Sequence, residues 1–220
     1  IGATMIGYSM DDLKKMGYFF KQVFNDKKID YLSVVETLVQ TADQARREGL
    51  LSLESQLAQI DIPFLSRGLQ LVIDGTDPEL TRNMLEMEIE AFEKQERVGA
   101  DVFMTAGGFA PTMGIIGTVM GLVHVLSNVS DPDELAGAIA VAFLATLYGV
   151  SSANVLWIPF ATKCKTKAEK RVLLMELILE GVLSIQAGEN PRVIKEKLMT
   201  FLPTDTRKAA EQQKALEMGM

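Results

Sequence analysis

The sequence of 220 residues combines 48% hydrophobic residues with 23% charged residues and a net charge of −7. The negative charge argues against nucleic acid as a partner. The single cysteine, Cys164, excludes an internal disulfide framework and a cysteine-based zinc site. Charged and apolar residues are separated along the chain, because residues 102–123 and 135–162 contain no Asp, Glu, Lys or Arg. This separation is typical of a membrane protein rather than of a soluble domain.

The first segment, residues 1–8, is apolar but too short to cross a bilayer. It lacks the basic start and the cleavage pattern of a signal peptide. We interpret it as the cytoplasmic end of a truncated transmembrane helix whose start precedes this sequence. We therefore expect more spans than the two complete ones described below.

Residues 9–100 predict a cytoplasmic domain of four or five amphipathic helices. Their starts are marked by Ser9, with Asp12 three residues later, and by Asp77 directly before a proline. Apolar stripes at helical spacing follow, formed by Val35, Leu38, Val39 and Ala42 and by Leu80, Met84, Leu85 and Phe92. No stretch alternates as a strand would, so the predicted fold class is all-α.

Two transmembrane helices are predicted at residues 101–127 and 134–162, joined by an external loop at 128–133. The first uncharged run, 22 residues, extends about 33 Å as a helix, which is enough to cross the hydrocarbon core. All 22 Lys and Arg lie before or after this pair of helices, and the loop has none. The positive-inside rule therefore places both charged flanks in the cytoplasm.

Residues 163–220 are expected to form cytoplasmic C-terminal helices and a polar tail. The second span should continue as a helix beyond the membrane, since a basic cluster and then an apolar helical pattern follow it without a break. Asn190 before Pro191 marks the start of another helix.

Small residues cover one face of each span and predict close helix contact. They are Gly107, Gly114, Gly117 and Gly121 in the first span and Ala138, Ala142, Ala145, Gly149 and Ala153 in the second. Thr118 and Thr146 lie on these two faces. Each is a candidate for an ion pathway, and each could equally be a packing residue whose hydroxyl bonds its own helix backbone.

Pro111 and Pro159 lie in the two spans, and each removes a backbone hydrogen bond, so each could kink its helix passively or act as a hinge. Neither span contains an ionisable side chain, and the only histidine, His124, lies at the outer end of the first. Ion pathways need an ionisable or strongly coordinating group at depth. If the chain conducts ions, a partner must therefore supply the carboxylate.

Several motifs resemble a known family. The run 106–121 (AGGFAPTMGIIGTVMG) resembles the third membrane helix of the MotA/PomA family of flagellar motor stator proteins, which is related to ExbB/TolQ. Further similar segments are 146–149 (TLYG), 158–159 (IP), 74–79 (DGTDPE) and 186–191 (QAGENP). The likeness covers residues 1–203. The family has four membrane helices, so it implies that the first and most of the second are missing here.

The resemblance implies a function. Members form a homopentameric ring around two copies of a MotB-like partner, whose aspartate binds the transported ion, in the bacterial inner membrane. The ring couples ion flow to torque on the rotor protein FliG, so H⁺ or Na⁺ is expected as the transported ion, with no cofactor and no resident metal. The family's rotor-contact residues match Arg46 and Glu54, with Arg47 and Glu48 close enough to compete. Its functional prolines match Pro111 and Pro159.

The resemblance also bears on the transported ion. The position of Thr146 is shared widely in the family, whereas that of Thr118 tends to be Thr in sodium-driven members and Ala in proton-driven ones. Thr at both positions favours Na⁺ over H⁺.

The sequence can be compared with three other classes of membrane protein. An ExbB/TolQ-type energiser should have three spans with its main cytoplasmic segment after the first, unlike the order here. A non-conducting scaffold, in which the Thr faces are only packing, remains open. A membrane enzyme is not expected, because the lone histidine and lone cysteine lie on different segments and form no catalytic constellation.

Overall fold

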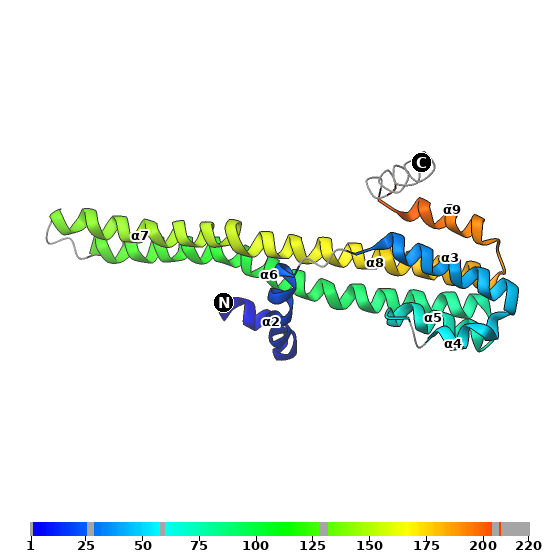
Figure 1. Ribbon diagram of the computed structural model, residues 1–220. Coiled ribbons are helices and arrows are strands. Elements are labelled where there is room, and N and C mark those ends of the chain that lie inside the picture. The colour runs from blue at the N-terminus through cyan, green and yellow to red at the C-terminus, as the bar shows by residue number, and fades with distance from the viewer. Residues whose placement is uncertain (1, 26–28, 58–59, 128–131, 204–206, 208–220) are drawn as a thin grey trace, which may run out of the picture. The chain divides into compact units, whose positions relative to one another are not determined.

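The structure, a computed structural model, describes residues 2–25, 29–57, 60–127, 132–203 and 207 (Figure 1). These residues form helices and no strand, which confirms the predicted all-α fold. The predicted external loop at 128–133 lies outside the described residues except for its last two, and the predicted tail beyond 203 does so except for Arg207.

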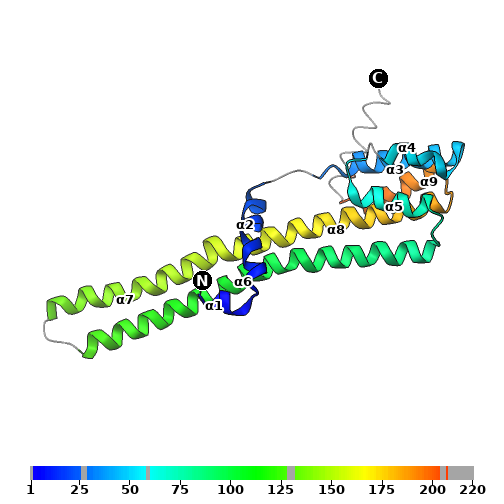
Figure 2. The same ribbon diagram turned by 90° about the horizontal axis from the view of Figure 1, so that it is seen from below.

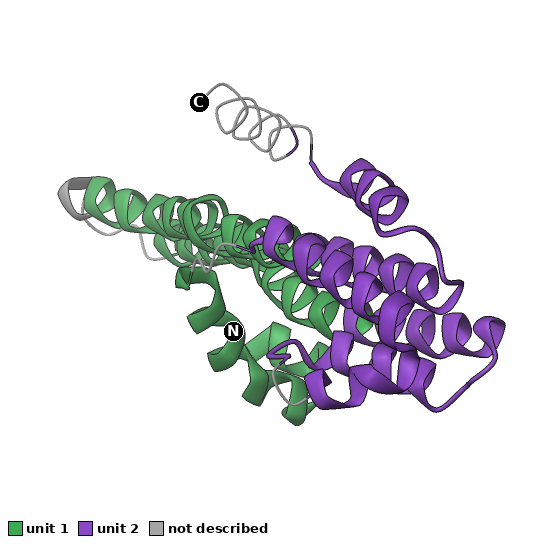
Figure 3. Cartoon of the chain, turned by 45° about the vertical axis from the view of Figure 1, so that its right-hand side comes forward, with its two compact units in different colours: residues 1–27, 94–168 green, residues 28–93, 169–220 purple. Residues whose placement is uncertain are grey.

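The chain divides into two compact units (Figure 3). Residues 1–27 and 94–168, here called the hairpin unit, form the first, and residues 28–93 and 169–220, the bundle unit, form the second. The boundaries fall inside the long helices α6 (Pro78–Ser127) and α8 (Ile158–Gln186). The segment predicted as a single domain at 9–100 is thus divided between both units.

The hairpin unit is built on two long antiparallel segments that lie side by side (Figures 1 and 2). One is the later part of α6, and the other is α7 (Pro132–Ser152), a π-helical turn η2 (Ala153–Trp157) and the start of α8. Two shorter helices, α1 (Gly2–Gly7) and α2 (Met10–Phe24), complete the unit.

Helix α2 belongs to the hairpin unit because its apolar face is buried there. Phe19 and Val23 pack in one cluster with Phe103 of α6 and Cys164 of α8. Gly99 of α6 leaves room for this contact, since a Cβ at that position would lie 2.5 Å from the Phe19 ring.

The two long segments have the length and composition of membrane spans. Windows within Pro78–Ser127 and Leu135–Gln186 reach mean hydropathies of 1.7 and 1.8, while only 11% and 6% of those windows is buried within the chain. A core helix of a soluble protein with such apolarity would be mostly buried. The exposed apolar surface is therefore that of helices that face lipid or other membrane helices, as the sequence predicts.

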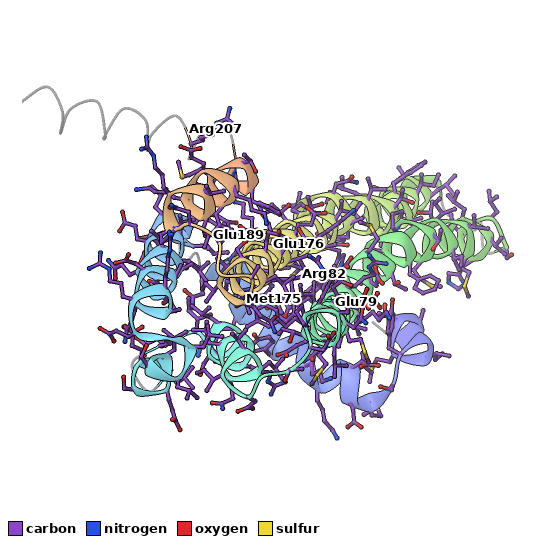
Figure 4. The ribbon with its side chains drawn as sticks, turned by 90° about the vertical axis from the view of Figure 1, so that its right-hand side faces the viewer. Glu79, Arg82, Met175, Glu176, Glu189 and Arg207 are labelled. Carbon is purple, nitrogen blue, oxygen red and sulfur yellow. The ribbon has the colours of Figure 1, made fainter. Side chains whose placement is uncertain are left out.

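The bundle unit is a set of helices packed around an apolar core. It comprises α3 (Tyr31–Glu48), a 3₁₀ turn η1 (Leu50–Leu53), α4 (Glu54–Leu57), α5 (Pro63–Ile73), the start of α6, the end of α8 and α9 (Pro191–Phe201). Fully buried side chains from six of these elements fill the core: Leu38, Leu53, Leu65, Leu69, Leu85, Leu177, Ile178, Ile194 and Leu198. Figure 4 labels Glu79 and Arg82 on α6 and Glu176 on α8, and Arg82 lies 3.7 Å from the carboxylate of Glu180, also on α8.

Two glycines set the spacing of this core. A Cβ on Gly181 of α8 would lie 2.7 Å from Leu38 of α3, and one on Gly68 of α5 would lie 2.9 Å from Val182 of α8. Both contacts are with side chains, so any larger residue would displace core leucine or valine groups from their packed positions.

The predicted helix starts are confirmed. The Ser9 hydroxyl accepts a hydrogen bond from the backbone N–H of Asp12 at 3.2 Å and donates one to the Asp12 carboxylate at 2.6 Å. Asp77 accepts from the backbone N–H of Glu79 at 2.9 Å, and Asn190 accepts from that of Arg192 at 2.9 Å. Each interaction satisfies N–H groups that a helix start leaves unpaired.

One predicted apolar stripe is wrong in part. In α3 the stripe holds, because Val35, Leu38 and Ala42 are buried. In α6 the predicted Leu85 is buried, but Leu80 and Met84 of the same stripe are 51% and 44% exposed. The buried face of this helix is formed by Leu85 together with Thr81, Ile89 and Glu96. Apolar residues lie on both sides of this part of α6, so periodicity alone does not identify the face that packs.

Candidate functional site

The hydroxyls of Thr118 in α6 and Thr146 in α7 meet inside the hairpin unit, with their oxygens 2.5 Å apart. Thr118 also lies within hydrogen-bond distance of two carbonyls, that of Ala142 in α7 at 2.8 Å and that of Gly114 in its own helix at 3.2 Å. Thr146 approaches the same Gly114 carbonyl at 3.4 Å. The pairing of these two hydroxyls, suggested only by their places on small-residue faces, is thus present in the structure.

Counting donors shows what this group of four oxygens can do. Two hydroxyls bring two protons and face two carbonyls and each other. If Thr118 donates to Ala142 and Thr146 donates to Thr118, both protons are used and the Thr146 oxygen keeps its lone pairs. Thr118 is only 9% exposed, whereas Thr146 is half-buried, so Thr146 is the more accessible residue of the pair.

The threonines meet because small residues let the two helices approach. A Cβ on Gly149 would lie 2.6 Å from the Ala110 carbonyl oxygen, and one on Gly114 would lie 2.8 Å from the Ala145 carbonyl oxygen. The contacts of Gly149 and Gly114 involve backbone atoms, which cannot move aside as side chains can. A Cβ on Gly121 would lie 2.9 Å from the Cβ and 3.4 Å from the Cα of Ala142. The predicted faces of small residues therefore form the seam of the hairpin.

The two prolines disturb adjoining parts of the seam. Pro111 has no N–H to donate to the carbonyl of Gly107, four residues earlier in α6. Gly107 packs against the start of α8, where a Cβ would lie 3.0 Å from the Ile158 side chain and 3.3 Å from that of Trp157. Ile158 directly precedes Pro159. The turn of α6 that lacks the Pro111 hydrogen bond therefore packs beside the turn that precedes Pro159.

Sequence reasoning missed the π-helical turn before Pro159. The backbone N–H of Ile158 bonds to the carbonyl of Ala153, five residues back, which gives a wider turn than an α-helix. A proline ring clashes with the carbonyl four residues before it, and a wider turn relieves that clash. A proline inside an otherwise helical apolar run was the signal that could have indicated it.

Arg46 and Glu54 lie in the bundle unit, in the last turn of α3 and at the first residue of α4, and both are exposed. Gly49, with a backbone φ of +86°, ends α3 between them. The neighbouring Arg47 makes an ion pair with Asp43 at 2.9 Å, and no such pair links Arg46 to another described residue. Their role in rotor contact stays a prediction.

The described part of the chain contains no group of three or more His, Cys, Asp or Glu that could hold a metal ion. Two charged residues that the sequence analysis did not single out are buried or partly buried in the hairpin unit. Glu96 is 7% exposed and accepts a hydrogen bond from Gln22 of α2 at 3.0 Å. Lys167 of α8 donates to the carbonyls of Gln22 and Asn25 at the end of α2, at 2.6 and 2.8 Å.

Comparison with known proteins agrees with these observations. Residues 56–177 match the model of the MotA/TolQ/ExbB proton channel family. Motility protein A of Bacillus subtilis (strain 168) is 41% identical over 217 residues, which cover 98% of this chain and 80% of the relative.

Two solved structures are similar throughout. The flagellar MotAB stator complex from Bacillus subtilis matches with a TM-score of 0.87 and 39% identity over 94% of this chain and 82% of that chain. MotAB of C. jejuni matches with a TM-score of 0.88 and 30% identity, covering 92% and 80%. This is an ion channel family rather than a family of enzymes. The chain therefore belongs to the MotA/TolQ/ExbB proton channel family, and within it to the MotA group of flagellar stator proteins.

Proposed function

We propose that this chain is the ring-forming subunit of a flagellar stator in the bacterial inner membrane. Five copies surround two copies of a MotB-like partner, and cation flow through the complex drives torque on the rotor protein FliG. Two solved complexes of similar chains, both MotAB, support the partner. The absence of any carboxylate in residues 102–123 and 135–162 fits a partner that supplies the ion-binding aspartate.

The observation that carries the ion pathway is the threonine pair. Four oxygens lie together at one point of the seam. The Thr118 hydroxyl is within hydrogen-bond distance of the Thr146 hydroxyl and of the carbonyls of Gly114 and Ala142. Hard cations such as Na⁺ exchange their hydration shell for oxygen ligands of this kind, whereas a proton needs only a titrating carboxylate and water. We therefore favour Na⁺ over H⁺ as the transported ion.

Proton transport is the alternative ion. The 3.2 Å approach of Thr118 to the Gly114 carbonyl, four residues back in its own helix, is the geometry of a packing threonine that satisfies itself. A hydroxyl used in this way leaves the partner's carboxylate as the only ion-binding group. The two assignments differ in their dependence on external Na⁺.

The test is swimming speed against external Na⁺ at fixed pH, in cells whose only stator subunit is this chain or a variant. We expect speed to rise with Na⁺ for the wild type, and Thr118→Ala to need more Na⁺ for the same speed. Thr118→Ser keeps the hydroxyl and is the matched control, expected to resemble the wild type. A wild-type speed that does not respond to Na⁺ would refute the sodium assignment and leave the proton.

A different observation supports the rotor contact. Both adjacent arginines in the last turn of α3 are exposed, and Arg47 makes an ion pair with Asp43 whereas Arg46 makes none with another described residue. Glu54 is exposed one short turn later. An exposed cation and an exposed anion on one stretch of the surface suit a partner that carries charges of both signs. We propose Arg46 and Glu54 as the pair that meets FliG.

A further inference from the structure

Helix α2 carries an exposed apolar stripe and an exposed basic stripe beside its buried side. Its buried side consists of Phe19, Gln22 and Val23. A stripe at helical spacing on another side contains Leu13, Gly17, Phe20 and Phe24, of which Phe20 is 49% and Phe24 is 65% exposed. The adjoining stripe holds Lys14 and Lys21, both exposed.

The apolar stripe continues onto the second span. The rings of Phe20 and Phe24 each contact Phe160, with centroids 5.3 and 5.7 Å apart, and they contact each other at 5.3 Å. Phe160 is close to the end of the uncharged run 135–162. Lys163 follows this run directly, so Phe160 lies near the point where the span leaves the hydrocarbon region, and its ring contacts place Phe20 and Phe24 at that depth.

Charge is divided unequally between the two units. The hairpin unit carries nine Lys and Arg against eight Asp and Glu, and three of these acidic residues lie between 131 and 134, at the opposite end of the two spans from the lysines after residue 162. The bundle unit carries 13 Lys and Arg against 21 Asp and Glu. A chain with a net charge of −7 thus concentrates positive charge beside its membrane helices.

Helix α2 is fixed to the hairpin by polar contacts as well as by its buried face. Lys167 donates hydrogen bonds to three carbonyls at the C-terminus of α2, those of Gln22, Val23 and Asn25, at 2.6, 3.3 and 2.8 Å. A lysine in this position satisfies carbonyls that lack helical donors and complements the negative end of the helix dipole. Its stripes are therefore held at one orientation relative to the spans.

We propose that α2 lies in the cytoplasmic membrane interface and binds anionic phospholipid headgroups. Phe20 and Phe24 enter the boundary of the acyl chains, while Lys14 and Lys21 on the next stripe reach the lipid phosphates. Lys14 pairs with Asp11 at 3.0 Å, but both side chains are exposed, so a phosphate can replace that carboxylate. Complementary charge and continuity with the span favour lipid over a protein partner for this face.

The proposal can be tested on the full chain with a fluorescent probe on α2. A Cβ at Gly17 meets nothing within 4 Å, so Gly17→Cys in a Cys164→Ser background gives a labelling site between the two lysines. Vesicles of one composition, phosphatidylcholine with phosphatidylglycerol, are prepared twice, with a quencher on one or the other lipid. The ratio of the two quenching efficiencies reports which lipid lies beside α2.

We expect quenching by phosphatidylglycerol to exceed that by phosphatidylcholine and to weaken with added salt. Each lysine near an anionic surface contributes about fivefold, so Lys14→Gln with Lys21→Gln should bring the ratio close to one. Lys14→Arg with Lys21→Arg should keep the preference. Arg192→Gln with Lys195→Gln removes the same charge from exposed positions of α9 and is the matched control, expected to behave like the wild type.

Three outcomes would overturn the proposal. Equal quenching by both lipids in the wild type would mean that α2 does not select anionic headgroups. An undiminished preference in the double glutamine variant would place the selectivity elsewhere. Absence of quenching by either lipid would mean that protein, such as a second copy of the chain, covers this face. None of these outcomes depends on the proposed motor function.

Discussion

At the scale of single residues, the hairpin depends on contacts that only the smallest side chains allow. Gly149 of α7 packs on the backbone of α6 at Ala110 and Gly114, and this approach is what lets the Thr118 and Thr146 hydroxyls meet. In lipid, helices gain little from the hydrophobic effect, so close packing and interhelical hydrogen bonds supply most of their attraction. The seam and the candidate ion pathway are therefore the same structure.

Gly149→Ala should destabilise this seam. The added methyl would lie 2.6 Å from the Ala110 carbonyl oxygen and 3.1 Å from the Gly114 Cα, so the two backbones must separate. Overpacking of this kind costs about 1–3 kcal/mol. Thermal unfolding of the purified protein in detergent should show a lower midpoint. Gly137→Ala on the same helix meets nothing within 4 Å and is the control, expected to be neutral or slightly stabilising.

Lys197 on α9 gives the bundle unit a dependence on alkaline pH. A hydrogen bond to Glu180 raises its pKa, partial burial opposes this, and the charges of Glu180 and Glu189 act in the same direction as the bond. Lys197 also donates to Ser184 at 3.1 Å. A raised pKa in the folded state contributes stability that is complete below the ordinary lysine pKa of about 10.4 and is lost as pH rises through the raised value.

Lys197→Met should therefore lower the unfolding midpoint at neutral pH, and the gap from the wild type should close above about pH 10.4. Lys195→Met, which removes an exposed lysine from the same helix, should produce no comparable gap. Melting curves across alkaline pH measure the difference. A gap that widens with rising pH would show that the interaction with Glu180 does not stabilise the folded state.

At the scale of elements, the second span is not one uniform helix. It consists of α7, the π-helical turn Ala153–Trp157 and α8, and Pro159 follows the turn. The first span has its own proline, Pro111, whose loosened turn at Gly107 packs on Ile158. Two adjacent weak turns on opposite sides of a seam form a place where the hairpin can bend without breaking its packing elsewhere.

Pro159→Ala tests whether this weakness is used. Alanine restores an N–H that can bond to the carbonyl of Val155, so a regular α-helical turn can replace the π-helical turn. An interior proline destabilises a helix by about 3 kcal/mol, and the substitution removes this cost. We expect an unfolding midpoint equal to or above that of the wild type, together with a clear loss of swimming speed. Pro63→Ala, at the first residue of α5, should leave swimming unchanged. Normal swimming of the Pro159→Ala variant would show that Pro159 and the π-helical turn before it have no role in motility.

At the scale of the whole molecule, the residues proposed for function are divided between the two units. The hairpin unit holds the threonine pair and the two prolines, and the bundle unit holds Arg46 and Glu54. Helices α6 and α8 each contribute to both units, so they connect the proposed ion pathway covalently to the proposed rotor contact. A change in the hairpin thus has two continuous helices through which it can affect the bundle.

Charge reversal at the proposed rotor contact should impair swimming without affecting assembly. Exposed ion pairs contribute up to about 1 kcal/mol each and are screened by salt, so Arg46→Glu or Glu54→Lys alone should slow cells rather than stop them. Protein level and co-purification with the MotB-like partner should be unchanged. Lys195→Glu reverses an exposed charge elsewhere in the bundle unit and should have no effect. Full speed in the Arg46→Glu, Glu54→Lys double variant would show that another surface meets the rotor.

The sequence by itself determined the features that rest on local chemistry. The uncharged runs at 102–123 and 135–162 determined the two membrane-spanning helices. Backbone N–H and C=O groups find no water in lipid, so they must be hydrogen-bonded within the protein, as they are in a helix. Helix starts at Ser9, Asp77 and Asn190 followed from side chains that bond to nearby N–H groups. Spacing of small residues identified the faces that pack, and these faces carried both threonines.

Only the tertiary structure decided the features that depend on contacts distant in sequence. Helix α2 belongs to the hairpin unit because Phe19 packs in one cluster with Phe103. The buried side of α6 includes Leu85 of the predicted stripe but leaves Leu80 and Met84 of that stripe exposed. The meeting of Thr118 and Thr146 needs a helix register set by Gly149 and Ala110. Hydropathy and capping act within a few residues. The register between two helices and the face that each helix buries are fixed by side chains that meet only after the helices pack.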